Sequence, residues 1–202
     1  MNPETMTTLR QLLRKECGYI PTDETLDLFL QETETLTLDS GEILIPVGHT
    51  DSSLYVVASG IIRFVDMDGE KERTSAFGTP GTIFMSKYSF VKNMPSYYQV
   101  EACCPSVLLR IRHKRYEELV RESHDFTLWM LNLAHEELFY QELKNSKVNN
   151  GNAKERFLAI IRNRPEIIGS VQQKIIASYL NITPEYLSRL RKNTRTMLKK
   201  DN

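Results

Sequence analysis

Three polar side chains near the C-terminus have the spacing and the chemistry to contact the base edges of DNA. Glu185, Ser188 and Arg189 stand at positions i, i+3 and i+4, so a helix would place them on one face. Arginine pairs with guanine, glutamate accepts from the amino group of cytosine, and serine contacts a base or a phosphate. The spacing therefore predicts a helix face that reads base pairs in a major groove.

The residues before this face predict a short turn between two helices. The run 170–173 has the capping-box spacing, which predicts that the first helix starts there. Asn181 tolerates the left-handed conformation that ends a helix. Thr183 can cap the next helix, and Pro184 suits its first position. The pattern is that of a helix-turn-helix, with the recognition helix over 184–195.

Charge is distributed unevenly along a chain of 202 residues whose net charge is zero. Residues 153–202 contain eleven Lys and Arg against four Asp and Glu, a net charge of +7, so residues 1–152 have −7. This asymmetry indicates a basic binding module joined to an acidic one, and keeps nucleic acid open as a partner. Side chains expected to contact the DNA backbone are Thr183, Arg191, Lys192, Arg195, Lys199 and Lys200.

The first half of the chain is typical of an all-β roll. Six of the nine glycines fall within residues 41–81, between short runs rich in β-branched and aromatic residues. The pair Asp68-Gly69 predicts a tight hairpin turn. Before this region, residues 5–16 and 22–33 have the pattern of amphipathic helices, the second with Thr22 as its cap.

A long helix is predicted from His113 to Lys147, because this stretch contains neither Pro nor Gly. One apolar stripe of this helix contains Phe126, Leu133 and Tyr140, and a second contains Leu131, Ala134 and Leu138. Two stripes suggest that one packs on the chain itself and the other on a second subunit. A single wide core-facing stripe is the alternative. We predict a homodimer whose helix contacts are Phe126, Trp129, Met130, Leu133 and Tyr140.

These elements predict an α+β fold with three parts. Residues 1–112 form an N-terminal antiparallel roll with flanking helices, and 113–148 a long dimerisation helix and hinge. Residues 149–202 form a helix-turn-helix domain. The Asn-rich run 145–152 marks the helix break between the last two parts.

An enzyme is the rival hypothesis, since a small barrel could hold a metal on facing strands. Only His49 lies in the β region, and Cys17, Cys103 and Cys104 have no metal-ligand spacing, so we expect neither a metal nor a cofactor. The chain lacks an apolar leader and any run long enough to span a bilayer, which favours a cytoplasmic protein without membrane contact.

The order of roll, long helix and helix-turn-helix, with "GEILIPVGHTDSSLYVVASGIIRFV" and "IIASYLNITPEYLSR", resembles the Crp/Fnr family of bacterial transcription regulators. The resemblance covers nearly the whole chain. It implies that Glu185, Ser188 and Arg189 read bases, and that a homodimer binds a pseudo-palindromic DNA site, with RNA polymerase as a further partner. A ligand-binding or dimerisation module without DNA binding is the alternative.

Three departures from the family pattern bear on function. Pro184 stands where many members carry another base-contacting residue, so the preferred half-site can differ. The chain ends soon after the recognition helix, which leaves a reduced or absent β-wing.

The third departure concerns the effector. Ser86 and Ser96 fall on the Glu and the Arg that bind cyclic nucleotide in the family, so a buried phosphate would lack its cation. We therefore expect no control by cyclic AMP, with a cyclic-nucleotide response through a non-standard pocket as an alternative. Two hypotheses stay open: a pocket for an unknown small molecule, or a pocket filled as core. The candidate effector pocket is Phe84, Met85, Ser86, Tyr88, Ser96, Tyr97 and Tyr98.

Overall fold

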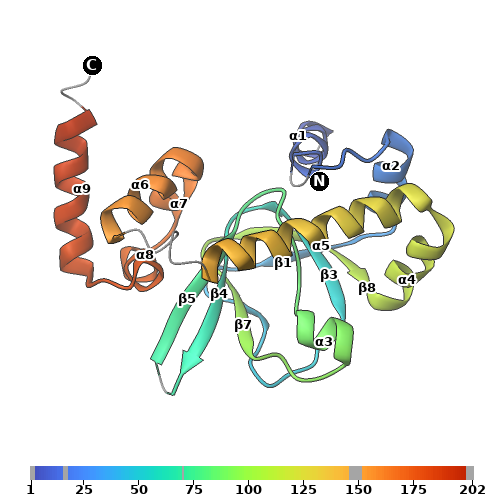
Figure 1. The fold of residues 1–202 in the computed structure, drawn as a ribbon, viewed down its shortest axis with the longest axis horizontal. Coiled ribbons are helices and arrows are strands. Elements are labelled where there is room, and N and C mark those ends of the chain that lie inside the picture. Colours follow the sequence, from blue (N-terminus) through green and yellow to red (C-terminus); the bar gives the residue numbers. More distant parts are fainter. Residues whose placement is uncertain (1–2, 16–17, 70, 146–151, 199–202) are drawn as a thin grey trace.

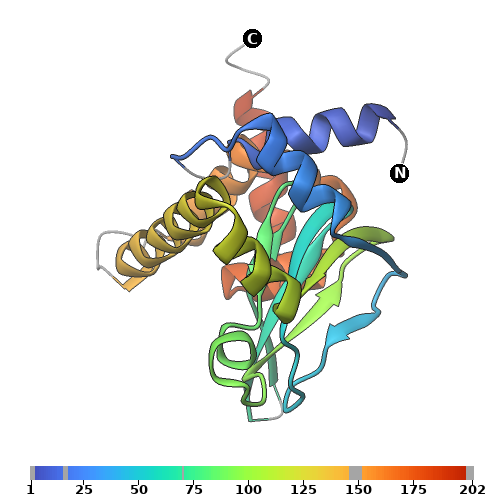
Figure 2. The same ribbon diagram turned by 90° about the vertical axis from the view of Figure 1, so that its right-hand side faces the viewer.

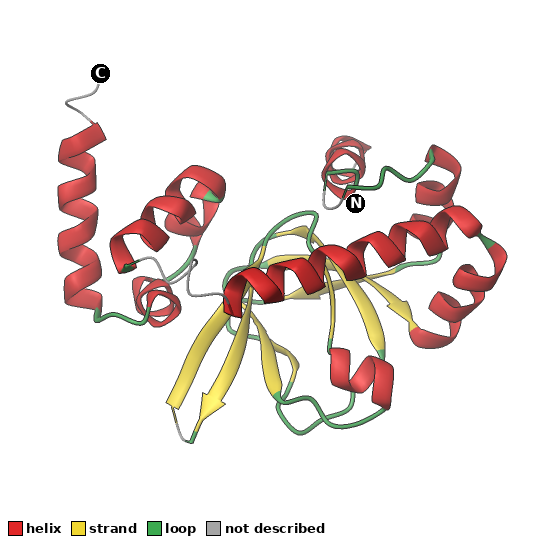
Figure 3. Cartoon of the chain, in the orientation of Figure 1, coloured by secondary structure: helices red, strands yellow, loops and turns green. Residues whose placement is uncertain are grey.

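An antiparallel β-roll carries helices on one side and is followed by a separate group of C-terminal helices (Figure 1). The computed structural model describes residues 3–15, 18–69, 71–145 and 152–198. Strands form one block in the middle of the molecule, with helices around and beyond it (Figure 3). The described elements are, in chain order, α1 (Pro3–Leu13), α2 (Asp23–Gln31), β1 (Glu34–Leu38), β2 (Ile43–Ile45), β3 (Ser53–Ser59), β4 (Ile62–Asp68), β5 (Lys71–Gly78), β6 (Ile83–Met85), α3 (Lys87–Lys92), β7 (Tyr98–Ala102), β8 (Ser106–Arg112), α4 (His113–Glu122), α5 (His124–Asn145), α6 (Ala153–Asn163), α7 (Pro165–Ser170), α8 (Gln173–Leu180) and α9 (Pro184–Leu198).

Two four-stranded sheets make the roll, in the orders β1-β8-β3-β6 and β2-β7-β4-β5, and all their pairings are antiparallel. Inward-facing side chains such as Val57, Ile62 and Leu108 are fully buried in one cluster. Period-two alternation of such residues places one face of each strand in the core. Asp68 pairs with Lys71 across the β4–β5 hairpin, which confirms the predicted turn.

Gly60 makes the turn from β3 to β4 and has a positive φ of 84°. A Cβ at this position would stand 2.2 Å from the Ser106 Oγ and 2.6 Å from the Pro105 carbonyl oxygen. Ser106 Oγ in turn accepts the Ile61 amide at 3.2 Å. The β7–β8 turn therefore crosses so close to Gly60 that only glycine fits.

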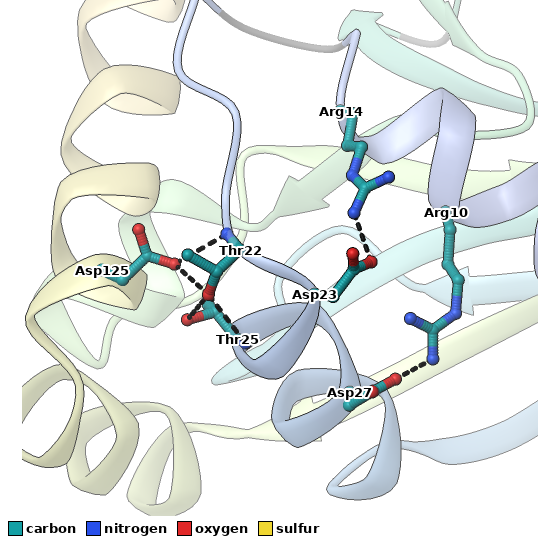
Figure 4. Close-up of polar contacts among 7 residues, drawn as sticks. All are labelled: Arg10, Arg14, Thr22, Asp23, Thr25, Asp27 and Asp125. Atoms are coloured by element: carbon teal, nitrogen blue, oxygen red, sulfur yellow. Dashed lines mark hydrogen bonds and ion pairs between the residues drawn. The ribbon is translucent and has the colours of Figure 1, made fainter.

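Helices α1 and α2 cover the sheet that contains β3 and β8, and both are tied to other helices by polar contacts (Figure 4). Thr22 caps α2 as predicted, accepting the Thr25 amide at 3.2 Å. Asp125, in the first turn of α5, accepts the Thr22 amide and hydroxyl, both at 2.9 Å, and the Tyr19 hydroxyl. Ion pairs Arg10–Asp27 and Arg14–Asp23 join α1 to α2.

The predicted single helix over 113–147 is wrong, because the chain breaks it into α4 and α5 at Ser123, where φ is −124° and ψ is 112°. Ser123 Oγ accepts the Phe126 amide at 3.1 Å, so this serine caps the start of α5. Thr127 closes the corner by donating to the Val120 carbonyl at 2.6 Å. Ser123 with an aspartate two residues later, Asp125, was the available start signal.

The assignment of apolar stripes on α5 also needs correction. Phe126, Trp129 and Met130 are buried in the chain's own core against α2, and Leu133 packs on the same cluster. Phe126, Trp129 and Met130 are therefore core residues, which makes their assignment as dimer contacts wrong. Leu133 is half-buried and Tyr140 is 46% exposed, so these two assignments stay predictions. Turned by 90°, the structure shows α5 along one side of the roll with its outer side uncovered (Figure 2). The apolar residues exposed on that helix include Leu131, Leu138 and Phe139.

Helices α6 to α9 form a C-terminal unit around a second buried cluster, which includes Phe157, Ile176, Leu180 and Leu187. Asn152 caps α6 through a reciprocal capping box with Glu155. The capping box predicted at 170–173 is wrong, because Ser170 ends α7 and Gln172 precedes α8 without a side-chain cap. The predicted α+β architecture is confirmed, and the described residues after β8 contain no strand.

Candidate nucleic-acid interface

The turn between α8 and α9 has the geometry that its residues predicted. Asn181 adopts a left-handed conformation, with φ 54° and ψ 48°. The Asn181 amide donates to the Ser178 carbonyl, and the Ile182 amide to the Ala177 carbonyl, both at 3.0 Å. These bonds satisfy carbonyls that the end of α8 would leave unpaired. Ala177 is buried and small, so the two helices cross closely.

Helix α9 begins at Pro184, after Thr183, as the sequence predicted. The Tyr186 amide donates to the Thr183 hydroxyl at 3.2 Å, which satisfies one free donor of the first turn. Leu187 and Leu190 are buried against α8 and its neighbours. Their burial fixes the rotation of α9 and thereby decides which residues face outward.

The outward face contains every residue predicted to read bases. Glu185, Ser188 and Arg189 are all exposed, and Lys192 is exposed on the same face. The pKa of the Glu185 carboxyl is lowered by a hydrogen bond to its own backbone amide, by the Thr183 hydroxyl and by the charge of Arg189. Glu185 is therefore an ionised acceptor at neutral pH, and the face offers an acceptor, a hydroxyl and cations side by side.

The structure describes only some of the cations that were predicted to bind the DNA backbone. Lys192 is exposed and Arg191 is half-buried at the edge of the outward face. The side chain of Arg195 and the whole of Lys199 and Lys200 lie outside the described residues. These three assignments stay predictions.

Arg156 on α6 has a structural role that sequence reasoning missed. Its guanidinium donates to the Leu180 carbonyl at 2.6 Å, so it caps the last turn of α8 just before Asn181. A cation at the C-terminal end of a helix is favoured by the helix dipole. Nothing in the local sequence pairs these residues, which are 24 positions apart.

The C-terminal unit packs directly on strand β5. The Thr74 amide donates to Ser178 Oγ of α8 at 3.0 Å, and Arg164 donates to Thr79 Oγ1 at 3.2 Å. The Phe77 ring lies 5.1 Å from the Tyr179 ring, between centroids. One apolar cluster thus joins the roll to the helices of the unit, and the orientation of α9 depends on the roll through α8.

In the interior of the roll, several residues predicted to line the effector pocket pack into an aromatic cluster. The Phe84 ring stacks on Tyr55 at 5.2 Å and meets Phe64 edge-on at 5.4 Å, and Phe64 contacts Tyr98 at 5.7 Å. The Tyr98 hydroxyl donates to the Met85 carbonyl at 2.8 Å. Burial raises the pKa of Tyr98 to about 12. Aromatic rings therefore occupy the space between the two sheets.

Ser86 and Ser96, the two serines that the sequence resemblance predicted at the ligand-binding positions, are buried and bonded within the chain. Ser86 Oγ donates to Ser89 Oγ at 3.1 Å, and Ser89 Oγ donates to the Met94 carbonyl at 2.8 Å. Ser96 Oγ donates to the Tyr98 carbonyl at 2.8 Å. These hydroxyls support the local loops rather than point toward an open space.

Tyr88 and Tyr97, also predicted for the pocket, lie elsewhere. Their rings pair at 4.5 Å between centroids on the outside of the roll, where Tyr97 is 67% exposed. Lys87, the residue before Tyr88, makes an ion pair with Glu137 of α5. The predicted pocket residues thus divide into an inner group around Phe84 and an outer pair.

No group of three or more His, Cys, Asp or Glu that could hold a metal occurs in the part of the chain that the structure describes. Cys103 and Cys104 are free thiols there, and burial raises the pKa of Cys103 to about 12. Cys17 lies outside the described residues. Among the described helices, none combines the length and apolar character needed to cross a membrane.

Residues 35–123 match the family model described as the cyclic nucleotide-binding domain. A curated relative, the neuropathy target esterase sws of Drosophila willistoni, is 30% identical over 102 residues. That alignment covers 47% of this chain and only 7% of the esterase. The likeness therefore concerns one domain of a much longer protein.

Solved structures extend the likeness to the whole fold. FixK2 from Bradyrhizobium japonicum is 19% identical, with a TM-score of 0.67, over 82% of this chain and 85% of FixK2. The catabolite activator protein of Thermus thermophilus is 20% identical, with a TM-score of 0.56, over 87% of this chain and 84% of that one. The resemblance to Crp/Fnr regulators is thereby confirmed at the level of the fold.

Proposed function

We propose that this chain, a cyclic nucleotide-binding domain joined to C-terminal helices in the Crp/Fnr fold, is a DNA-binding transcription regulator that acts as a homodimer. The observation that supports it best is the outward face of α9. Glu185, Ser188 and Arg189 are exposed together on a helix whose start and rotation are fixed by Thr183 and Leu187. A helix held this way fits a major groove, with its first turns at the base edges.

The position of α9 in the molecule supports the same function. It lies at the end of the molecule farthest from α4, beyond α6 and α8, and its outer side meets no other element (Figure 1). Residues 153–202 carry a net charge of +7, which suits a polyanion. The base contacts are assigned to Glu185, Ser188 and Arg189, and phosphate contacts to the surrounding cations.

The dimer contact is assigned to the outward stripe of α5. Leu131 is 47% exposed, Leu138 67% and Phe139 58%, with Ala134 exposed between the two leucines. An exposed apolar stripe on a long helix fits a second copy of the same helix. A two-fold dimer would present two α9 helices to two half-sites of a pseudo-palindrome.

Cyclic AMP is not the proposed effector. A bound cyclic phosphate needs a cation, yet Ser86 and Ser96 occupy the expected ligand positions and bond to the chain itself. The stacked rings of Tyr55 and Phe84 supply the apolar packing of the roll interior. We infer a regulator that folds into its DNA-binding form without a nucleotide.

The test is selection of bound sequences from a random duplex pool by the purified protein, alone and with a metabolite extract. Enrichment of an inverted repeat by the protein alone is the expected result. Enrichment only with extract would assign an effector to the roll. Absence of enrichment under both conditions would overturn the proposal in favour of a module that binds protein.

The dimer is tested separately with Leu131→Glu combined with Leu138→Glu. Four charges brought together across the helix pair should convert the dimer to a monomer in analytical ultracentrifugation. The matched control is Met67→Glu, because Met67 is 43% exposed on strand β4, whereas α3 is ion-paired to α5 through Lys87 and Glu137. A double variant that stays dimeric would remove α5 from the interface.

A further inference from the structure

Tyr186 is an exposed aromatic residue on α9 to which the base-reading assignment gives no role. Its side chain is 40% exposed, while its helix neighbours Leu187 and Leu190 are buried. It does not belong to the core of the C-terminal unit. An exposed ring in the first turns of a helix that would enter a groove lies where it can contact either DNA or a neighbouring side chain.

That neighbouring side chain is Arg189, one turn farther along the same helix. The guanidinium carbon of Arg189 lies 5.6 Å from the centre of the Tyr186 ring, at the i, i+3 spacing that brings helix side chains together. A guanidinium at this distance is attracted to the negative face of the ring. Arg189 also feels the carboxylate of Glu185, whose pKa its charge helps to lower.

Arg189 therefore has two neighbours that compete for it. If the guanidinium turned fully onto Glu185, both base-reading groups would be lost in an ion pair. The ring of Tyr186 draws the guanidinium away from Glu185 and leaves the Glu185 carboxylate as an acceptor. An arginine already held in one orientation also loses less side-chain freedom when it binds a base.

We infer that Tyr186 is the positioning residue for Arg189, holding its guanidinium in the orientation that reads guanine. The inference rests on the proposed function for its DNA readout and on the ring contact itself for its geometry. Tyr186 thereby contributes to base discrimination through Arg189 rather than to general affinity for DNA.

The experiment compares Tyr186→Phe, which keeps the ring, with Tyr186→Leu, which keeps apolar bulk but removes the π-system. The guanine that Arg189 reads is first identified as the one whose replacement no longer weakens binding by Arg189→Ala. Competition binding is then measured on the selected duplex and on duplexes in which this guanine is replaced by each other base. Tyr186→Leu should lower the preference for guanine by about two- to fivefold, the range of an exposed cation–π contact. Tyr186→Phe should keep the preference.

Three results would overturn the inference: an unchanged preference in Tyr186→Leu, an equal loss on random DNA, or the same loss in Tyr186→Phe. In an Arg189→Ala background, Tyr186→Leu should change nothing further, because the pair acts as a unit. Tyr97→Leu is the matched control, since Tyr97 is an exposed tyrosine outside α9.

A measurement on the free protein separates this inference from the proposed function. The NMR signal of the Arg189 side-chain Nε–Hε group should carry a ring-current shift that Tyr186→Leu removes and Tyr186→Phe retains. An unaffected signal would contradict the contact whatever the protein binds. A shift that is present while wild-type protein selects no DNA would contradict the proposed function and leave only the ring contact standing.

Discussion

Polar side chains in the interior of the roll are bonded within the chain, whereas those on the outward face of α9 are exposed to solvent. In the roll, Ser86, Ser96 and Tyr98 are bonded to groups of the same loops and strands. On α9, Glu185 and Arg189 hold their charged ends at the surface. The difference agrees with the proposed function, in which the interior of the roll is filled by its own side chains and the outward face of α9 is open to DNA.

The closed roll predicts a large cost for removing its central ring. Phe84→Ala would leave a cavity between Tyr55 and Phe64, and should lower the free energy of unfolding by about 3–5 kcal/mol. Urea titration followed by circular dichroism measures it. Tyr97→Ala, at an exposed ring, should stay within about 0.5 kcal/mol of wild type. A cost near zero for Phe84→Ala would mean that the interior is not packed and can hold a ligand.

The open face predicts a smaller loss, limited to specific DNA. Arg189→Ala should weaken binding to the selected site by about 1–3 kcal/mol and leave binding to random DNA nearly unchanged. Titration of labelled duplexes at fixed salt concentration measures both. Arg162→Ala is the matched control, because Arg162 is exposed on α6 and not on α9. Equal losses on both kinds of DNA would make Arg189 a phosphate contact.

Asp125 joins α5 to the N-terminal end of α2, where it accepts hydrogen bonds from Tyr19 and Thr22. Burial alone would raise its pKa, but hydrogen bonds from Thr25, Tyr19 and Thr22 outweigh burial and lower it to about 2. A lowered pKa stabilises the fold above the unfolded value near 3.9 and loses this effect as pH falls toward 2.

Asp125→Asn should therefore destabilise by about 1 kcal/mol at pH 7, after allowance for solvent screening, and by progressively less below pH 4. Chemical denaturation at a series of pH values gives the difference from wild type. Asp39→Asn, at an exposed loop carboxylate, is the control. A difference that does not change with pH would show that the charge of Asp125 is not what holds the helices.

The smallest expected effect is that of cyclic AMP. At millimolar nucleotide, the melting temperature should stay within about 1 °C of the apo value, because a ligand that does not bind shifts no folding equilibrium. Differential scanning fluorimetry is sufficient. A clear rise in the melting temperature would contradict a closed roll interior, since it would require a phosphate site that does not use the side chains at 86 and 96.

Helices α8 and α9 and the turn between them were predictable because their signals are local. Asn181, Thr183 and Pro184 each favour one backbone conformation, and together they define the turn. Ser170 failed as a cap because Pro165 starts a separate short helix that includes it. Two start signals five residues apart cannot be ranked without the packing of α7 on its neighbours.

Burial was harder to predict than secondary structure. Both stripes of α5 are apolar, and only the position of α2 decides that Trp129 is inside while Leu138 is outside. Likewise, aromatic residues around Phe84 fit a filled core and a pocket lining equally well, and the stacking distances come from the packed fold. Sequence spacing also gave no sign that Tyr97 lies on the surface.

Strand β5 stands at the edge of its sheet, where it would otherwise present unpaired backbone groups to any other chain. Ser178 accepts the Thr74 amide on that edge, and the helices of the C-terminal unit cover Ile61, Phe77 and Cys103 beside it. A roll cut off after α5 would expose both the edge and these apolar side chains. We expect such a fragment to be prone to aggregation by strand addition, because the helices of the C-terminal unit also protect this edge of the roll.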